Sequence, residues 1–181
     1  MTGPERGGLR TNQDLDPDRL REVFGTFPSG VVAVAALVDG VPVGLAASSF
    51  TSVSLDPPLV SFCIANTSKT WPDLRRAPHL GVTILAEHHS AVARQLAGAV
   101  ERRFDGLPLI VTAEGAVTLD DGLAHFDTTI YNEVPAGDHT IVLLRLSAAG
   151  RSQLPDPAPG SGVRITVGYD HAKFLATLLE C

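Results

Sequence analysis

Cysteine is scarce in this sequence, and its scarcity excludes two classes of protein. Only Cys63 and Cys181 occur among 181 residues. Two cysteines cannot build the set of disulfides that stabilises small secreted domains, nor a cysteine-rich metal site. Cys63 lies in an apolar run and Cys181 is the last residue, so we interpret them as a buried small side chain and a frayed terminus.

Long apolar segments are also missing. The longest run, Gly30 to Val38, has about nine residues, whereas a membrane-spanning helix needs about 20. The stretch from Met1 to Asn12 is polar and rich in Gly and Arg, without the apolar segment of a secretory signal. We therefore expect a soluble, cytoplasmic protein, with residues 1–15 as a disordered tail and residues 16–181 as one domain.

Basic blocks and the common nucleotide and nucleophile motifs do not occur. The net charge is −6, from 20 acidic and 14 basic residues, which argues against nucleic acid as the main partner. No G-x-G-x-x-G motif follows a strand, and neither G-x-x-x-x-G-K-[ST] nor G-x-S-x-G occurs. A nicotinamide would therefore not bind in the Rossmann manner.

The apolar pattern predicts a mainly β protein. Asp39-Gly40 is a strong signal for a two-residue hairpin between strands. Strands are expected at 31–38, 41–47, 59–64, 79–85, 109–112, 116–119, 124–131, 139–147 and 163–168, and short helices at 17–27, 68–76, 88–99 and 169–179. Residues 150–162 are expected to form a loop. Because strands and helices do not alternate regularly, a closed or partly open antiparallel barrel fits best.

Two polar segments could bind a ligand. Residues 46–54 offer several small hydroxyl groups, which would let a flat ligand approach the backbone closely, although an ordinary Ser/Thr-rich strand end reads the same way. Residues 66–71 follow a strand and open a helix, whose free amides suit a phosphate. Here Ser68 and Thr70 add hydroxyls and Lys69 adds a charge; the alternative is a plain helix cap with a solvent-facing lysine.

Two further segments carry candidate groups. In Glu101–Phe104 an arginine could reach a phosphate and Phe104 could stack on a ring, or the segment is a solvated charge run. In Gly137–Thr140, His139 could hydrogen-bond a cofactor or polarise a reacting group, or it is a structural histidine. A metal at the pair His88-His89 is disfavoured, because neighbouring residues on a helix do not face one site.

Taken in order, these segments resemble the flavin reductase domain family, the reductase components of two-component flavin-dependent monooxygenases. The resemblance covers roughly residues 17–148 and is most specific over residues 47–58, Ala-Ser-Ser-Phe to Pro-Pro. The other matching segments are Phe27–Val32, Asp39-Gly40, Ser68–Thr70, Arg103–Gly106 and Gly137–His139. Two departures are Leu144, where the family often has glycine, and the tail at 161–171, onto which no site residue maps.

The resemblance implies an FMN-binding split barrel, that is, a mainly β, antiparallel split β-barrel with a few short flanking helices, usually as a homodimer. His139 would be the catalytic residue near the nicotinamide and flavin rings. No metal is implied. The residues implied to bind the flavin are, for the ring and ribityl chain, Ala47, Ser48, Ser49, Thr51 and Ser54; for the phosphate, Ser68, Lys69 and Thr70; and, for further contacts, Arg103 and Phe104.

The implied activity is that of an NAD(P)H:flavin oxidoreductase. It would transfer hydride from NADH or NADPH, with NADH favoured, to FAD or FMN, and supply the reduced flavin to a partner monooxygenase. Two alternatives stay open at this point. One is a non-catalytic flavin-binding or electron-carrier protein, and the other is an enzyme like pyridoxamine-phosphate oxidase on a related barrel.

Overall fold

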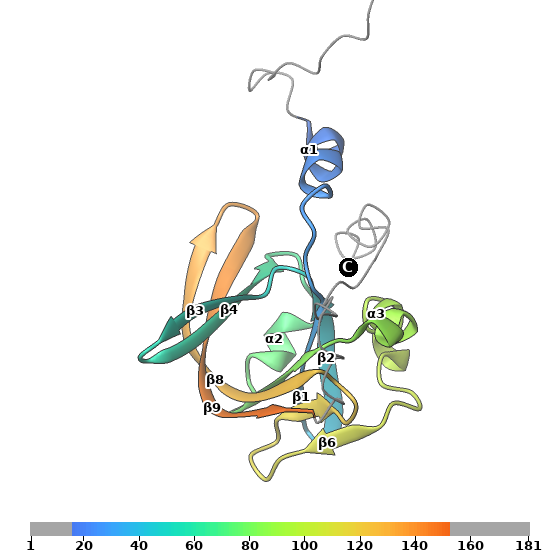
Figure 1. The fold of residues 1–181 in the computed structure, drawn as a ribbon, viewed down its shortest axis with the longest axis vertical. Coiled ribbons are helices and arrows are strands. Elements are labelled where there is room, and N and C mark those ends of the chain that lie inside the picture. The colour runs from blue at the N-terminus through green and yellow to red at the C-terminus, as the bar shows by residue number, and fades with distance from the viewer. Residues whose placement is uncertain (1–15, 153–181) are drawn as a thin grey trace, which may run out of the picture.

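An antiparallel sheet of seven strands forms the centre of the protein (Figure 1). The computed structural model describes residues 16–152. The strands lie in the order β2-β1-β5-β8-β9-β4-β3, so β2 and β3 are the two edges. The bounds are β1 Val32–Val38, β2 Val41–Ala47, β3 Thr51–Leu55, β4 Pro58–Ala65, β5 Leu80–Ile84, β8 Ala124–Ala136 and β9 His139–Arg151.

Short helices and a two-stranded sheet surround this main sheet. Strands β6 (Leu109–Val111) and β7 (Val117–Leu119) pair with each other. The helices are α1 (Pro17–Phe24), α2 (Trp71–Leu74) and α3 (Ser90–Leu96), and the 3₁₀ turns are η2 (Glu87–His89) and η3 (Val100–Arg102). None of these helices is both long and apolar enough to cross a bilayer. The prediction of a mainly β, antiparallel fold with a few short helices is confirmed.

The sequence of strand β1 is apolar without alternation because both faces of the strand are buried. Val32, Val34 and Ala36 join the inner cluster, which also holds Trp71 and Leu74 of α2. In Figure 1 the strands curve around α2, which fills the space between them. Buried strands read as continuous hydrophobic runs for this reason.

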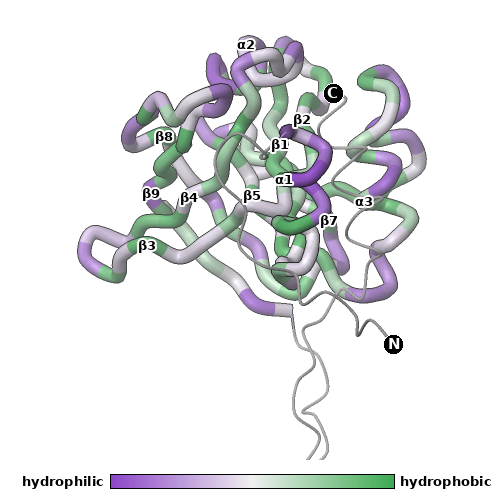
Figure 2. Tube along the Cα trace, turned by 90° about the horizontal axis from the view of Figure 1, so that it is seen from above, coloured by the Kyte–Doolittle hydropathy of each residue, from purple (hydrophilic) through white to green (hydrophobic). Residues whose placement is uncertain are grey.

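A second cluster lies on the other face of β1. Val31 and Ala33 pack there with Ala46 of β2, and with Ala93 and Leu96 of α3. The departure at Leu144 also belongs to packing, because this side chain is fully buried in the inner cluster. Figure 2 shows hydrophobic residues along the strands, while many of the connecting turns are hydrophilic.

The two hairpin turns follow from their sequences. Asp39 and Gly40 both have positive φ, at 51° and 81°, and Val38 pairs with Val41 across them, as predicted for an Asp-Gly hairpin. The β8–β9 turn is shorter than the sequence suggested. Only Gly137 and Asp138 lie between the strands, since Pro135 still pairs with Thr140 in extended conformation.

Several element boundaries differ from the predictions. The most consequential is β3, which was read as a polar segment because it is an edge strand with Ser or Thr at three of its five positions. The predicted helix 88–99 is divided into η2 and α3, and the helix predicted at 68–76 is a single turn. Residues 150–151 extend β9 rather than opening a loop, and the strand and helix predicted beyond residue 162 lie outside the described residues.

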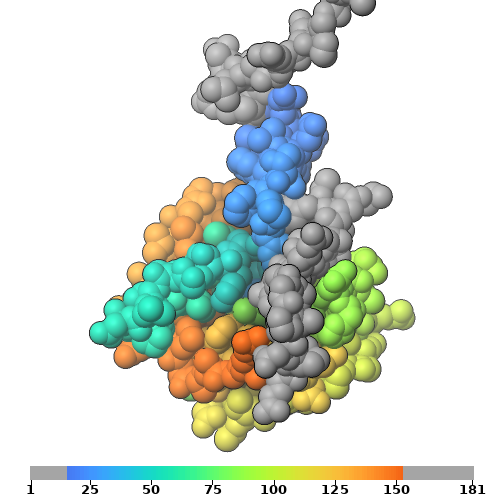
Figure 3. Space-filling view, viewed as in Figure 1, coloured from blue at the N-terminus to red at the C-terminus, as the bar shows by residue number. Residues whose placement is uncertain are grey.

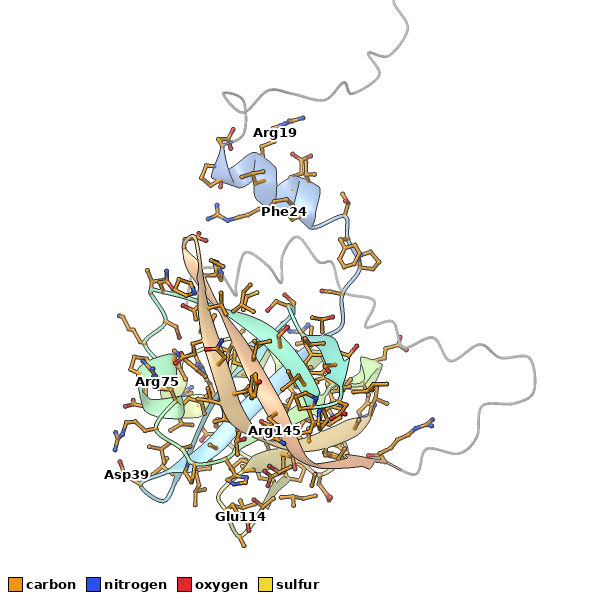
Figure 4. The ribbon with its side chains drawn as sticks, turned by 90° about the vertical axis from the view of Figure 1, so that its left-hand side faces the viewer. Arg19, Phe24, Asp39, Arg75, Glu114 and Arg145 are labelled. Carbon is orange, nitrogen blue, oxygen red and sulfur yellow. The ribbon has the colours of Figure 1, made fainter. Side chains whose placement is uncertain are left out.

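Two parts of the molecule project from its body. Helix α1 stands off the sheet, and the β3–β4 hairpin extends from one side (Figure 3). Both expose large apolar side chains, with Phe24 62% and Leu55 95% exposed. Figure 4 shows Phe24 on the detached helix, away from the strands.

Candidate functional site

The end of strand β4 brings three of the four predicted segments together. Ser49 lies in the bend between β2 and β3, and its hydroxyl satisfies both backbone groups of Cys63 on β4. Oγ accepts from the Cys63 amide at 2.8 Å and donates to the Cys63 carbonyl at 3.3 Å. Two residues further along β4, Ala65 pairs with His139. The small-hydroxyl segment and the histidine therefore flank the end of the same strand from its two sides, although 90 residues separate them in sequence.

The third segment joins this group through Asn66, which follows β4 directly. Its amide donates to the Asp138 carbonyl at 2.9 Å, and its side-chain Nδ2 donates to the Gly137 carbonyl at 3.1 Å. Residues 66–70 thus begin against the turn that carries His139. No motif in the sequence indicated this role for Asn66, because its partners lie more than 70 residues away.

The predicted phosphate-binding segment is held in place by its own hydrogen bonds. Ser68 Oγ accepts from the Trp71 amide at 3.2 Å, while Thr70 is the N-cap residue of α2. Lys69 is exposed, and no carboxylate within residues 16–152 forms an ion pair with it. Thr70 is buried. Because α2 has only one turn, its dipole is short, and the Lys69 charge becomes the main attraction for an anion at this position.

Arg103 lies inside the protein, only 4% exposed. Its Nη1 donates to the Gly44 carbonyl at 2.9 Å and to Thr70 Oγ1 at 2.8 Å, and its Nε donates to the Gly98 carbonyl at 3.0 Å. No carboxylate of the described residues is paired with it. The guanidinium therefore ties together β2, the loop after α3 and the predicted phosphate-binding segment. Sequence reasoning had placed this arginine either on a ligand or in solvent, since nothing local indicates its burial.

Phe104 packs against the same part of β2. A Cβ atom at Gly44 would lie 2.8 Å from the Phe104 ring and 2.5 Å from the Val34 carbonyl, so only glycine leaves room for the ring. The ring is half-buried beside the second apolar cluster. Gly44 and the Arg103-Phe104 pair thus form one packed unit.

The remaining predicted flavin residues follow the chain along β2 and β3. Ala47 ends β2 and is buried, whereas Ser48 is half-buried in the bend. Thr51 is exposed on β3 opposite Ser61, and Ser54 lies at a bulge opposite Leu59. Leu59 is six residues from Ala65 along β4, which at about 3.3 Å per residue is about 20 Å. Along β4, Ser54 therefore lies farther from His139 than Thr51 does.

His139 and Asp138 form a pair at the start of β9. Asp138 Oδ1 lies 2.7 Å from His139 Nδ1. The hydrogen bond and charge of His139 lower the pKa of the Asp138 carboxyl. Since an ionised carboxylate only accepts hydrogen bonds, the Nδ1 atom carries the proton, and in the neutral ring Nε2 has a free lone pair. The histidine side chain is about a quarter exposed, at 28%.

His88, His89 and Asp121 form the one cluster of possible metal ligands within residues 16–152, with ligand atoms within 4.8 Å of one another. The expectation that the two histidines cannot face one site does not hold, because they lie on a 3₁₀ turn with ring centroids 4.0 Å apart. The Ala86 amide donates to His89 Nδ1, so the ring proton lies on Nε2, 2.9 Å from Asp121. A protonated nitrogen cannot ligate a metal, and with Nδ1 accepting a hydrogen bond the ring is neutral, so this arrangement is a polar contact between an imidazole N–H and a carboxylate.

The contacts of Asp121 with the two histidines affect its titration. Burial disfavours its charged form, but the hydrogen bond and charge of His89 outweigh this effect, so the pKa of Asp121 is lowered. This pair connects η2 to the loop before β8 and lies outside the group of residues around β4.

The class of protein is mainly β, with an antiparallel sheet that curves around a one-turn helix. Its candidate site at one end of β4 combines small hydroxyl groups, a histidine and a lysine that forms no ion pair within residues 16–152. Comparison with known proteins narrows this class. Residues 24–160 match the model of the flavin reductase like domain. The chain belongs to this family, as the sequence resemblance predicted.

Curated relatives carry names of the same kind. The reductase subunit HsaB of a flavin-dependent monooxygenase from Rhodococcus jostii (strain RHA1) is 35% identical over 141 residues, which are 78% of this chain and 72% of that protein. A flavin reductase from Pseudomonas putida is 38% identical over 130 residues, 71% of this chain and 76% of that protein. Coverage of other relatives is lower: the chain spans 47% and 61% of two Rhizobium meliloti proteins.

Solved structures agree with the fold. The NADH:FAD oxidoreductase SgcE6 of Streptomyces globisporus C-1027, in complex with NAD and FAD fragments, superimposes with a TM-score of 0.72 at 34% identity. The match covers 81% of this chain and 87% of that chain. Nitrilotriacetate monooxygenase component B from Mycobacterium thermoresistibile gives the same TM-score, 0.72, at 31% identity, over 78% of each chain.

Proposed function

We propose that this chain is an NAD(P)H:flavin oxidoreductase that reduces FAD or FMN and supplies the reduced flavin to a partner monooxygenase. The observation that carries the proposal is the meeting of Ser49, the 66–70 loop and His139 at one end of β4. Family membership and relatives named as reductase components of two-component monooxygenases support it. NADH is the proposed preferred reductant, as in the NADH:FAD oxidoreductase of similar fold.

The residues of this region fit a flavin. Ser48 is half-buried and has no hydrogen-bond partner among the described side chains, so its hydroxyl is free for a ligand. The Ser49 hydroxyl is already engaged with β4, and we assign it to shaping the bend that presents Ala47 and Ser48. Thr51 and Ser54 follow on β3, and we assign them to the flavin bound by a second copy of the chain.

The phosphate end of the flavin is assigned to Ser68, Lys69 and Thr70. Lys69 supplies an unpaired positive charge, and a charge-assisted hydrogen bond to phosphate is about twice as strong as a neutral one. Thr70 is held by the buried guanidinium of Arg103. We therefore assign Arg103 and Phe104 to fixing the wall of the site, with Arg103 acting on the flavin through Thr70.

His139 is assigned to the nicotinamide side. A bound flavin supplies the hydride-accepting ring, while the protein supplies position and charge. Asp138 holds the His139 ring by its Nδ1–H, which directs the Nε2 lone pair away from the carboxylate. From there Nε2 can accept a hydrogen bond from a carboxamide or, when protonated, donate one to a ring carbonyl. No nucleophile is needed, which agrees with the missing nucleophile motif.

We further propose a homodimer that works in the cytoplasm, where reduced nicotinamide is available. Support for the dimer comes from large apolar side chains exposed on β3 and β8: Val53 at 48%, Leu55 at 95% and Tyr131 at 52%. Exposed apolar side chains close together on one strand, such as Val53 and Leu55, are typical of association surfaces. Sedimentation of the wild type and of Leu55→Asp tests this, and a monomeric wild type would contradict it.

The activity is tested with the four pairings of NADH or NADPH with FAD or FMN. Loss of nicotinamide absorbance with at least one pairing is expected, and no loss with any pairing would refute the proposal. His139→Ala should lower kcat more than it weakens flavin binding. His88→Ala is the matched control, since His88 is an exposed histidine outside this region, and it should keep the wild-type rate.

Two other outcomes identify other functions. A flavin that stays bound through gel filtration without turnover of free flavin would indicate an electron carrier. Oxidation of an amine with release of hydrogen peroxide would indicate an enzyme like pyridoxamine-phosphate oxidase.

A further inference from the structure

Asn66 makes three hydrogen bonds that tie the end of β4 to the β8–β9 hairpin. Its amide and its Nδ2 donate to the carbonyls of Asp138 and Gly137, at 2.9 and 3.1 Å, and Thr140 Oγ1 donates to its Oδ1 at 3.0 Å. The side chain thus uses its donor and its acceptor on the two sides of His139. Only a carboxamide of this length offers both at once.

Few other contacts fix this hairpin end. Residues 135–138 are all exposed, so no buried apolar side chain holds the turn. His139 forms the last strand pair on both sides, with Ala136 and with Ala65. Terminal pairs of a hairpin open most readily, because they have neighbours on one side only. The bonds from Asn66 therefore decide how firmly the segment around His139 is held.

The same residue begins the 66–70 loop. Its position couples the segment that bears Lys69 to the segment that bears His139 through one side chain. These bonds fix the distance between the two segments, so a ligand that contacts both of them depends on the bonds being intact. In an active site a misplacement of about 1 Å can cost a factor of about 100 in rate.

We propose that Asn66 is a positioning residue for hydride transfer. It holds the Gly137–Asp138 turn so that Asp138 remains on His139 Nδ1 and Nε2 faces the nicotinamide. The inference rests on the proposed function, because Asn66 would act on hydride transfer only through His139. Asn66 itself is exposed and is not assigned to a reacting atom.

The test is a double-mutant cycle between Asn66→Ala and His139→Ala, read by stopped-flow hydride transfer from NADH to flavin. Asn66→Ala alone should lower the rate about 10- to 100-fold, with flavin affinity changed less than about threefold. In the His139→Ala background the same substitution should change the rate less than about twofold, because the group it positions is already gone. Asn132→Ala, on the exposed face of β8, is the matched control and should behave as wild type.

The other outcomes overturn the proposal. Equal losses in both backgrounds would show a general structural role, and a wild-type rate for Asn66→Ala would show no role. If Asn66→Ala does not fold, Thr140→Val removes one of the three bonds and should lower the rate in the same direction, again only when His139 is present. Inactive wild type with all four reductant and flavin pairings would refute the proposed function instead.

Discussion

Arg103 offers the most direct test of how the site is built. Its guanidinium makes three hydrogen bonds inside the protein and is not paired with any carboxylate in the part of the chain that the structure describes. Replacement by alanine would leave the carbonyls of Gly44 and Gly98 and the hydroxyl of Thr70 without their partner. We expect Arg103→Ala to destabilise the fold and to weaken flavin binding.

The size of the effect follows from two opposing terms. Hydrogen bonds to a charged donor contribute about 1.5–3 kcal/mol each, so the three bonds together contribute at most about 5–9 kcal/mol. Burying the unpaired charge of Arg103 destabilises the folded state by several kcal/mol, and the alanine variant no longer carries this penalty. A net loss of about 3 kcal/mol in the free energy of unfolding remains, which for a domain of this size lowers Tm by roughly 6–12 °C.

Urea and thermal unfolding of apo-protein measure this loss without any ligand. Arg102→Ala is the matched control, because Arg102 is the adjacent arginine, is exposed, and should change stability by less than about 0.5 kcal/mol. Arg103→Lys keeps the charge but not the fork of donors, and we expect about half of the loss. If Arg103→Ala is as stable as Arg102→Ala, the guanidinium does not hold these elements together and the reasoning is refuted.

Three further predictions test other parts of the structure. Gly81→Ala should cost more than about 3 kcal/mol in unfolding experiments, because its Cβ would lie 2.0 Å from the Val117 carbonyl, whereas Gly30→Ala, with open space, should cost under about 1 kcal/mol. Asp121→Asn should destabilise the protein at neutral pH. Since the folded-state pKa of Asp121 is lowered, its contribution is present above the unfolded pKa of about 3.9 and is lost as pH falls through the folded value, so the two proteins should converge in acid. Lys69→Ala should weaken FMN about tenfold and riboflavin hardly at all, measured by fluorescence titration, and equal losses would contradict a phosphate contact.

The sequence alone was sufficient to predict those elements that are determined by interactions between residues close together in the chain. The Asp39-Gly40 turn and the apolar run of β1 depend on residues within a few positions of each other, and both were predicted. Strand β3 was missed because Ser and Thr occupy three of its five positions and its apolar residues, Val53 and Leu55, are exposed instead of joining a core. The β8–β9 turn was read as too long, because Pro135 signals a turn even where a strand edge tolerates it.

The ordered motifs of the sequence determined the family and the segments that could form a site, because each segment carries its own chemistry. Only the tertiary structure decided which side chains meet. It buried Arg103 behind Thr70, engaged the Ser49 hydroxyl with β4, and set Asn66 between the 66–70 loop and His139. The physical reason is that hydrogen bonds between residues 14 to 74 positions apart depend on strand register and on the curvature of the sheet, and neither is written in any local pattern.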